Sequence, residues 1–157
     1  MEKIHFGSGD ITTLILIKKD ALVTAELTKY YVDPLADYGI SADNVAANGL
    51  LYEDSKVKVD LGKGYLRMLL PTLEKLPKLK KLIVADTNYF KWLTKQTKVT
   101  NSYGETFKGE LTGYENYEIV LVPNYKSLFY NPNNIELIQE GISAISGRKK
   151  DDIIYSA

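Results

Sequence analysis

The chain has 157 residues, of which 45% are hydrophobic and 25% are charged, values typical of a globular protein. A chain of this length favours one domain with a core of its own. Twenty lysines and arginines balance twenty aspartates and glutamates, so the net charge is zero. This balance excludes a protein-wide basic field, and binding of nucleic acid therefore requires a local patch.

Several classes of site are excluded by residue types that are rare or absent. The chain has no cysteine, which excludes disulfides, thiol nucleophiles and cysteine-based zinc sites. The single histidine, His5, lies in a polar leader, where a catalytic triad is improbable. The glycine motifs of nucleotide-binding loops and the G-x-S-x-G nucleophile elbow are also missing. We therefore predict no metal and no cofactor.

The sequence contains no apolar run of the roughly 18 residues that a membrane span needs, and no signal peptide is visible. We expect a protein of the cytoplasm and no membrane partner.

Four short apolar segments predict buried strands, because they are rich in β-branched residues and lack strict alternation. They are residues 11–17, 43–51, 82–85 and 119–122, of which the second has the weakest pattern. Residues 1–10 are interpreted as a loose leader. Residues 99–111 contain Gly104 and Gly109 among alternating polar residues, which favours a β-hairpin.

Helical spacing of apolar residues predicts four helices, over residues 23–38, 62–76, 89–95 and 134–145. At Asp33-Pro34 the first helix either kinks or gives way to a second short helix that Asp33 caps, and Gly39 is a plausible stop. Pro71 predicts a kink or two pieces in the second helix. The lysine-rich segment 75–81 is interpreted as a solvated face that complements the helix dipole, with a phosphate contact as the alternative.

Strands that alternate with helices indicate an α/β fold, a three-layer α/β/α sandwich on a mainly parallel sheet. We predict one domain over residues 1–147 and a boundary or linker tail over residues 148–157. Right-handed crossovers bring the carboxyl ends of the strands to one edge of the sheet, where ligands bind in open α/β folds.

Polar residues follow each predicted strand and should meet at that edge. The best candidate is the polar, aromatic and cationic tetrapeptide after the fourth strand, and a solvated loop is the alternative. The predicted ligand- or nucleic-acid-binding residues are Lys18, Lys19, Asn48, Asn124, Tyr125, Lys126 and Ser127. The segment Asp86-Thr87-Asn88 lies at the same edge and is predicted to cap the third helix.

The fourth predicted strand leads into the phrase VPNYKSLFYNPN, from Val122 to Asn133. In this phrase the second half of the chain resembles the uracil-DNA glycosylase superfamily, whose His-Pro-Ser loop follows its own fourth strand. The order of elements fits over residues 11–145. The resemblance implies a four-stranded parallel sheet of order 2-1-3-4. It is greatest to the degenerate glycosylase-like domain at the N-terminus of some phage-type family A DNA polymerases.

Three positions indicate how much of the glycosylase chemistry the resemblance carries over. The loop histidine, which stabilises the uracil oxyanion, falls on Lys126, whose charge sits on a flexible stem. The asparagine that reads the uracil edge falls on Asn48. The glycine-rich motif that activates water falls on residues 18–22, where Asp20 is the only carboxylate. Lys126 and Asp20 are therefore the candidate catalytic residues, and the loss of the first motif predicts a fold without glycosylase activity.

Three functions remain open at this point. The first is a non-catalytic accessory domain of a phage polymerase that contacts single-stranded or template DNA, other replication proteins or the remainder of a longer polymerase chain. The second is a stand-alone interaction or inhibitor domain that uses a tyrosine-rich surface, since the chain has twelve tyrosines. The third is an active base-excision enzyme that uses Lys126 and Asn48, with Lys126 as an amine nucleophile.

Overall fold

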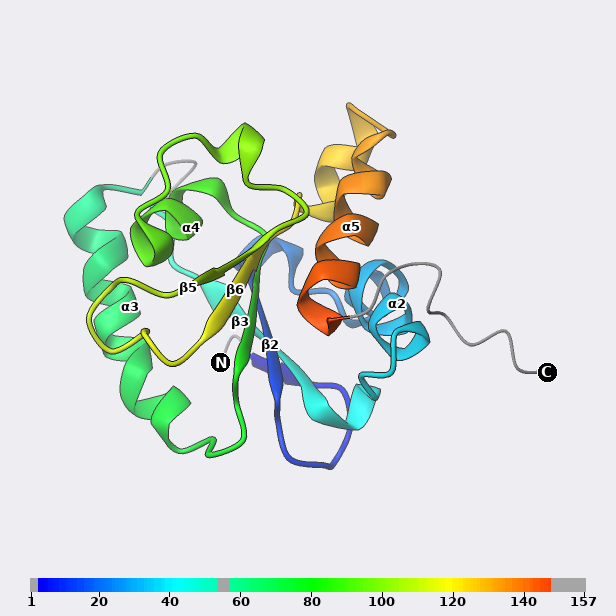
Figure 1. Ribbon diagram of the computed structural model, residues 1–157, viewed down its shortest axis with the longest axis horizontal. Coiled ribbons are helices and arrows are strands. Elements are labelled where there is room, and N and C mark those ends of the chain that lie inside the picture. Colours follow the sequence, from blue (N-terminus) through cyan, green and yellow to red (C-terminus); the bar gives the residue numbers. More distant parts are fainter. Residues whose placement is uncertain (1–2, 54–56, 148–157) are drawn as a thin grey trace.

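The protein is described by a computed structural model that covers residues 3–53 and 57–147. The chain forms an α/β fold around a six-stranded sheet of order β1-β3-β2-β4-β6-β5 (Figure 1). The strands are β1 (Lys3–His5), β2 (Thr13–Lys18), β3 (Val45–Leu50), β4 (Lys81–Val84), β5 (Thr106–Lys108) and β6 (Glu118–Leu121). The predicted tail, residues 148–157, lies outside the described residues.

The four central strands run parallel, in the spatial order β3-β2-β4-β6. Counted along the chain among these four alone, that order is 2-1-3-4. All four predicted strands form, because each apolar segment is buried on both faces of the sheet, as parallel strands require.

The two edge strands correct the sequence analysis. The predicted loose leader contains β1, which pairs antiparallel with β3. The predicted hairpin over residues 99–111 does not form; it holds the short helix Val99–Asn101 and β5, which pairs antiparallel with β6. A sheet of four strands was therefore wrong. Both edge strands are three residues long, too short to produce a clear alternation pattern.

Helices cover both faces of the sheet, so the fold has three layers (Figure 1). In the figure, α3 and α4 lie on the left of the sheet, while α2 and α5 lie on the right. The α-helices are α1 (Thr24–Leu27), α2 (Asp33–Asp37), α3 (Val59–Glu74), α4 (Thr87–Thr94) and α5 (Asn134–Ser146). The remaining short helices are Lys19–Ala21, Thr28–Val32, Ala42–Asn44, Val99–Asn101 and Tyr125–Phe129.

Two prolines, Pro34 and Pro71, were predicted to interrupt helices. Pro71 lies inside α3, which is a single helix. At Pro34 a second short helix, α2, does form, but Asp33 is its first residue and not its cap, and the π-helical turn Thr28–Val32 joins it to α1 without a break. Gly39 adopts a φ of 94°, which confirms it as the stop after α2.

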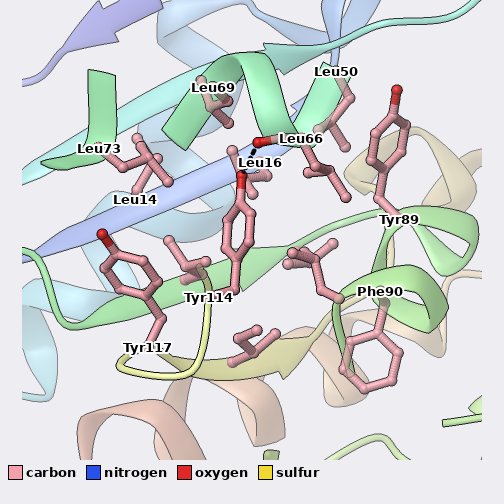
Figure 2. Close-up of a cluster of buried hydrophobic side chains, with 14 of the residues drawn as sticks. Leu14, Leu16, Leu50, Leu66, Leu69, Leu73, Tyr89, Phe90, Tyr114 and Tyr117 are labelled. Atoms are coloured by element: carbon pink, nitrogen blue, oxygen red, sulfur yellow. Dashed lines mark hydrogen bonds between the residues drawn. The ribbon is translucent and has the colours of Figure 1, made fainter. Parts of the chain in front are cut away.

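Alternation along the strands divides the core into two. Leu14, Leu16 and Leu82 face α3 and α4, whereas Ile15 and Ile83 belong to the core under α2 and α5. Figure 2 shows the first core, in which the fully buried Tyr114 reaches across the layer.

The hydroxyl of Tyr114 donates to the backbone carbonyl of Leu66 in α3, at 2.5 Å. Six tyrosines are buried among the described residues: Tyr31, Tyr38, Tyr89, Tyr114, Tyr117 and Tyr125. Tyr130 is the one exposed tyrosine in the described part of the chain. The tyrosine-rich surface expected from composition is therefore largely a tyrosine-rich core.

Candidate functional site at the carboxyl edge of the strands

The register of the central strands brings a cation and a carboxylate together where the strands end. Leu16 of β2 pairs with Val84 of β4, so two residues further on Lys18 and Asp86 lie opposite each other. Both side chains point toward α3 and α4, because they continue the alternation of the leucine-lined core. The edge is therefore polar at its centre, as the sequence predicted.

Asp86 begins α4, which confirms the predicted cap. Its Oδ1 accepts a hydrogen bond from the Tyr89 backbone N–H at 2.9 Å, and its Oδ2 accepts one from the Tyr52 hydroxyl. Burial raises the pKa of the Asp86 carboxyl, although these hydrogen bonds and the charge of Lys18 favour its ionised form.

Lys18 and Tyr52 complete what we call the Tyr52–Asp86 corner, the group formed by Lys18, Tyr52, Asp86 and Tyr89. The Lys18 ammonium lies 4.3 Å from the centre of the Tyr52 ring, a cation–π contact. The Tyr89 hydroxyl donates to the Leu51 carbonyl at 2.6 Å, and its ring packs beside that of Tyr52. Each polar group of the corner is thus engaged within the protein.

Asn48 lies in β3, on the same face as the corner, since it pairs with Leu16. Its amide nitrogen donates to the Gly49 carbonyl and to the Tyr65 hydroxyl, each at 3.2 Å. The Tyr65 hydroxyl in turn donates to the Gly49 carbonyl. The amide proposed to read a base edge therefore already has two internal partners.

The tetrapeptide after β6 folds as a capped 3-10 helix, Tyr125–Phe129. The Asn124 side chain accepts from the Lys126 backbone N–H at 2.9 Å, which fixes the turn. The Ser127 hydroxyl donates to the Asn124 carbonyl at 2.7 Å and accepts from the Asn134 side chain at 3.0 Å. Asn124 and Ser127 therefore shape the loop and tie it to α5.

Lys126 and Asp20, the two candidate catalytic residues, form an ion pair. The Lys126 Nζ lies 3.4 Å from the Asp20 Oδ2, and the two side chains are 48% and 64% exposed. An exposed pair of this kind contributes about 0–1 kcal/mol to stability. The exposure also leaves the Lys126 ammonium without the burial that an amine nucleophile needs.

Tyr125 is buried, with 8% of its surface exposed, and belongs to the core under α2 and α5. Its ring stacks on Tyr30 with a centroid distance of 5.5 Å, and its hydroxyl donates to the Ala21 carbonyl at 3.1 Å. Nearby, the Tyr31 hydroxyl donates to the Pro123 carbonyl at 2.8 Å. Tyr125 therefore anchors the loop and presents no face on which a base can stack.

The predicted site residues thus gather in two groups on opposite faces of the sheet. Lys18 and Asn48 face α3 and α4, whereas Lys126 pairs with Asp20 beside the core that contains Tyr125. Lys19 follows Lys18 in the exposed turn that leads to Asp20. The expected meeting of these residues at one edge is therefore divided, because the Lys18 ammonium lies over Tyr52 whereas Tyr125 is buried in the core on the other face.

Sequence reasoning missed three residues at this edge. Tyr52 follows β3 at an even spacing from Asn48, which is the signal that places it on the same face. Phe129 and Tyr130 follow the tetrapeptide and are 87% and 86% exposed. No pattern in the sequence distinguishes these two exposed aromatic residues from the buried Tyr125.

Residues 3–53 and 57–147 contain no group of three histidine, aspartate or glutamate side chains placed to hold a metal ion. Over the same residues, none of the helices has the length and apolar character needed to cross a membrane.

No protein-family model matches this chain, and no curated protein is significantly similar to it.

Proposed function

We propose that this chain is a non-catalytic binding module with a uracil-DNA glycosylase-like fold, similar to the N-terminal domain of some phage-type family A DNA polymerases. It acts in the cytoplasm, contacting single-stranded or template DNA, or a replication partner, through the carboxyl edge of its strands. The observation that carries the proposal is the parallel order β3-β2-β4-β6, with the Lys126 loop directly after β6. That order equals the 2-1-3-4 order which the resemblance implies.

The absence of catalysis is supported by how the candidate groups are used. Lys126 and Asp20 neutralise each other at the surface, and Asp86 accepts two hydrogen bonds within the Tyr52–Asp86 corner. Base excision requires a snug pocket and a positioned water or carboxylate. None of the three groups is poised for that role.

The other two functions have weaker support. Base excision by Lys126 and Asn48 requires a buried amine and a free amide, whereas Lys126 is half exposed and Asn48 donates to two internal partners. Borohydride trapping of a covalent adduct on abasic DNA would favour that alternative. A tyrosine-rich interaction surface is reduced to Tyr130 among the described residues.

The proposal is tested by titrating the protein into a fluorescein-labelled 15-mer of oligothymidylate and measuring anisotropy from 25 to 200 mM salt. Lys126→Ala should weaken binding and reduce the salt slope by about 0.7, the contribution of one phosphate contact on a single strand. Lys78→Ala is the control, because Lys78 also forms an exposed ion pair, with Asp10 at 3.3 Å, and lies at the opposite ends of the strands. Equal effects of the two substitutions would contradict the proposal.

A further inference from the structure

The turn between β6 and α5 presents two aromatic rings to solvent. Phe129 is 87% exposed and Tyr130 86%, the highest values among the exposed large hydrophobic side chains of the described residues. Their ring centroids are 5.3 Å apart and their planes meet at 85°. Most of both residues is therefore in contact with water, and the aromatic surface is open to a ligand.

The backbone that carries the two rings is held in place by several hydrogen bonds. The Ser127 carbonyl accepts from the N–H groups of Tyr130 and Asn131, at 3.1 and 2.9 Å. The Asn131 carbonyl accepts from the Asn134 N–H at 3.0 Å, at the start of α5. The Asn131 side chain accepts from the Asn133 N–H at 3.3 Å. The rings therefore project from a preorganised turn, which lowers the entropic cost of binding.

The location of the turn links the rings to the proposed binding edge. It begins at Asn124, just past the carboxyl end of β6, and Lys126 lies three residues before Phe129. In Figure 1 the gold and orange segment between β6 and α5 forms an outer tip of the molecule, beyond the end of the sheet. A strand of nucleic acid that contacts Lys126 can therefore reach both rings.

We propose that Phe129 and Tyr130 form a stacking platform for the unpaired bases of a single-stranded nucleic acid. This inference rests on the proposed function and names the residues that bind. Every base has a π-face, so stacking on an exposed ring needs no particular sequence. Because the two ring planes are nearly perpendicular, they stack two bases that diverge, as in a bent single strand, rather than two bases of a duplex.

The surroundings of the rings favour bases over a protein surface. The neighbouring side chains are the amides Asn131 and Asn133, with the cation Lys126 on the same turn. Of the other exposed large hydrophobic residues described, Val59 and Met68 belong to α3. A stable protein interface buries about 800 Å² on each partner around an apolar centre, and two rings among amides supply much less.

The low charge of this turn also predicts how binding of the oligonucleotide depends on salt. Lys126 is the only charged residue between Pro123 and Asn134, and Asp20 is paired with it. Stacking is insensitive to salt, whereas each phosphate contact adds to the salt slope. The rings should therefore set the affinity at every salt concentration, while Lys126 should set the slope.

The experiment uses the whole chain and the labelled 15-mer of oligothymidylate, with anisotropy measured at two salt concentrations. Phe129→Ala combined with Tyr130→Ala should weaken binding by tenfold or more and leave the salt slope unchanged. Met68→Ala is the matched control for removing an exposed apolar side chain, since Met68 is 77% exposed. Phe129→Trp should retain binding, and oligonucleotide should quench its added fluorescence relative to the wild type, which has Trp92 alone.

Each contrary result has a distinct meaning. If the wild type binds and the double variant binds equally well, the stacking platform is wrong while the proposed nucleic-acid contact stands. If the wild type does not bind the oligonucleotide at all, the stacking platform and the proposed contact with single-stranded DNA are both wrong, and a replication partner is the contact that the proposed function still allows. If instead the wild type forms a dimer that the double variant abolishes, the rings are a protein contact and the stacking platform is again wrong.

Discussion

Two regions at the same edge of the sheet use similar residues in opposite ways. In the Tyr52–Asp86 corner, aromatic and charged side chains bond to one another beneath the start of α4. In the β6–α5 turn, residues 124–134, the backbone bonds are internal and the rings of Phe129 and Tyr130 point into solvent. Residue type alone therefore does not separate a buried, stabilising aromatic residue from an exposed one; the helix that covers it does.

The largest effect expected from this comparison is on the free energy of unfolding. Tyr89→Ala should reduce it by about 3–5 kcal/mol, because Tyr89 is fully buried, packs against Tyr52, Tyr65 and Trp92, and donates to the Leu51 carbonyl. Tyr130→Ala should change it by less than about 0.5 kcal/mol, because Tyr130 lies at the surface. Urea denaturation measures the free energy of unfolding of both variants. Equal losses would contradict the expected difference between the buried and the exposed tyrosine.

Asp86→Ala should reduce the free energy of unfolding by about 1–2 kcal/mol, because α4 loses its cap and the Tyr52 hydroxyl loses its acceptor. Asp86→Asn keeps an oxygen that can accept from the Tyr89 N–H, so it should be less harmful. Thermal melts of the two variants distinguish capping from charge. If Asp86→Ala leaves the free energy of unfolding unchanged, the Tyr52–Asp86 corner does not stabilise α4.

The raised pKa of the Asp86 carboxyl predicts how the stability of the fold depends on pH. Because its pKa is raised in the folded state above the ordinary value of 3.8, the folded state holds the proton at pH values where the unfolded chain has released it. The contribution of Asp86 to stability is therefore greatest below pH 3.8 and falls as pH rises through the folded pKa. The stability difference between wild type and Asp86→Asn, measured in urea from pH 3 to 7, should fall over this window and then level off. A difference that rises with pH would mean that the pKa is lowered.

The smallest expected effect belongs to the exposed ion pair. Asp20→Asn should change the free energy of unfolding by less than about 1 kcal/mol, because both partners are about half exposed or more. The same substitution frees the Lys126 charge, so it should tighten binding of oligothymidylate at low salt. A denaturation curve and an anisotropy titration on one preparation measure both. Weaker binding would show that Asp20 itself contacts the ligand.

The central strands could be predicted from sequence because a parallel strand is apolar on both faces over its whole length. The segments around Leu14, Leu82 and Val120 contain that signal, and all three form strands. The edge strands β1 and β5 could not be predicted, because each is only three residues long, and the partner of β1 is remote in the sequence. Edge pairing depends on tertiary context more than on local pattern.

The candidate site was predictable in position but not in the direction of its side chains. Lys126, Asn48 and Lys18 do lie at the carboxyl edge, as strand ends followed by polar residues indicate. The burial of Tyr125 and the exposure of Tyr130 depend on how one turn packs against α5 and the neighbouring helices, which no local periodicity reports. A turn of this kind has neither the 2-residue nor the 3.6-residue period on which such reasoning rests.

We propose that this edge binds nucleic acid without catalysing, because its candidate acid and amine, Asp20 and Lys126, pair with each other and the Asn48 amide donates to two other groups of the protein. The most direct test is to incubate the protein with a uracil-containing oligonucleotide and treat the product with hot alkali, which cleaves DNA at abasic sites. The account predicts that the oligonucleotide stays intact even with protein in excess. Clean scission at the uracil that disappears in Lys126→Ala would contradict it.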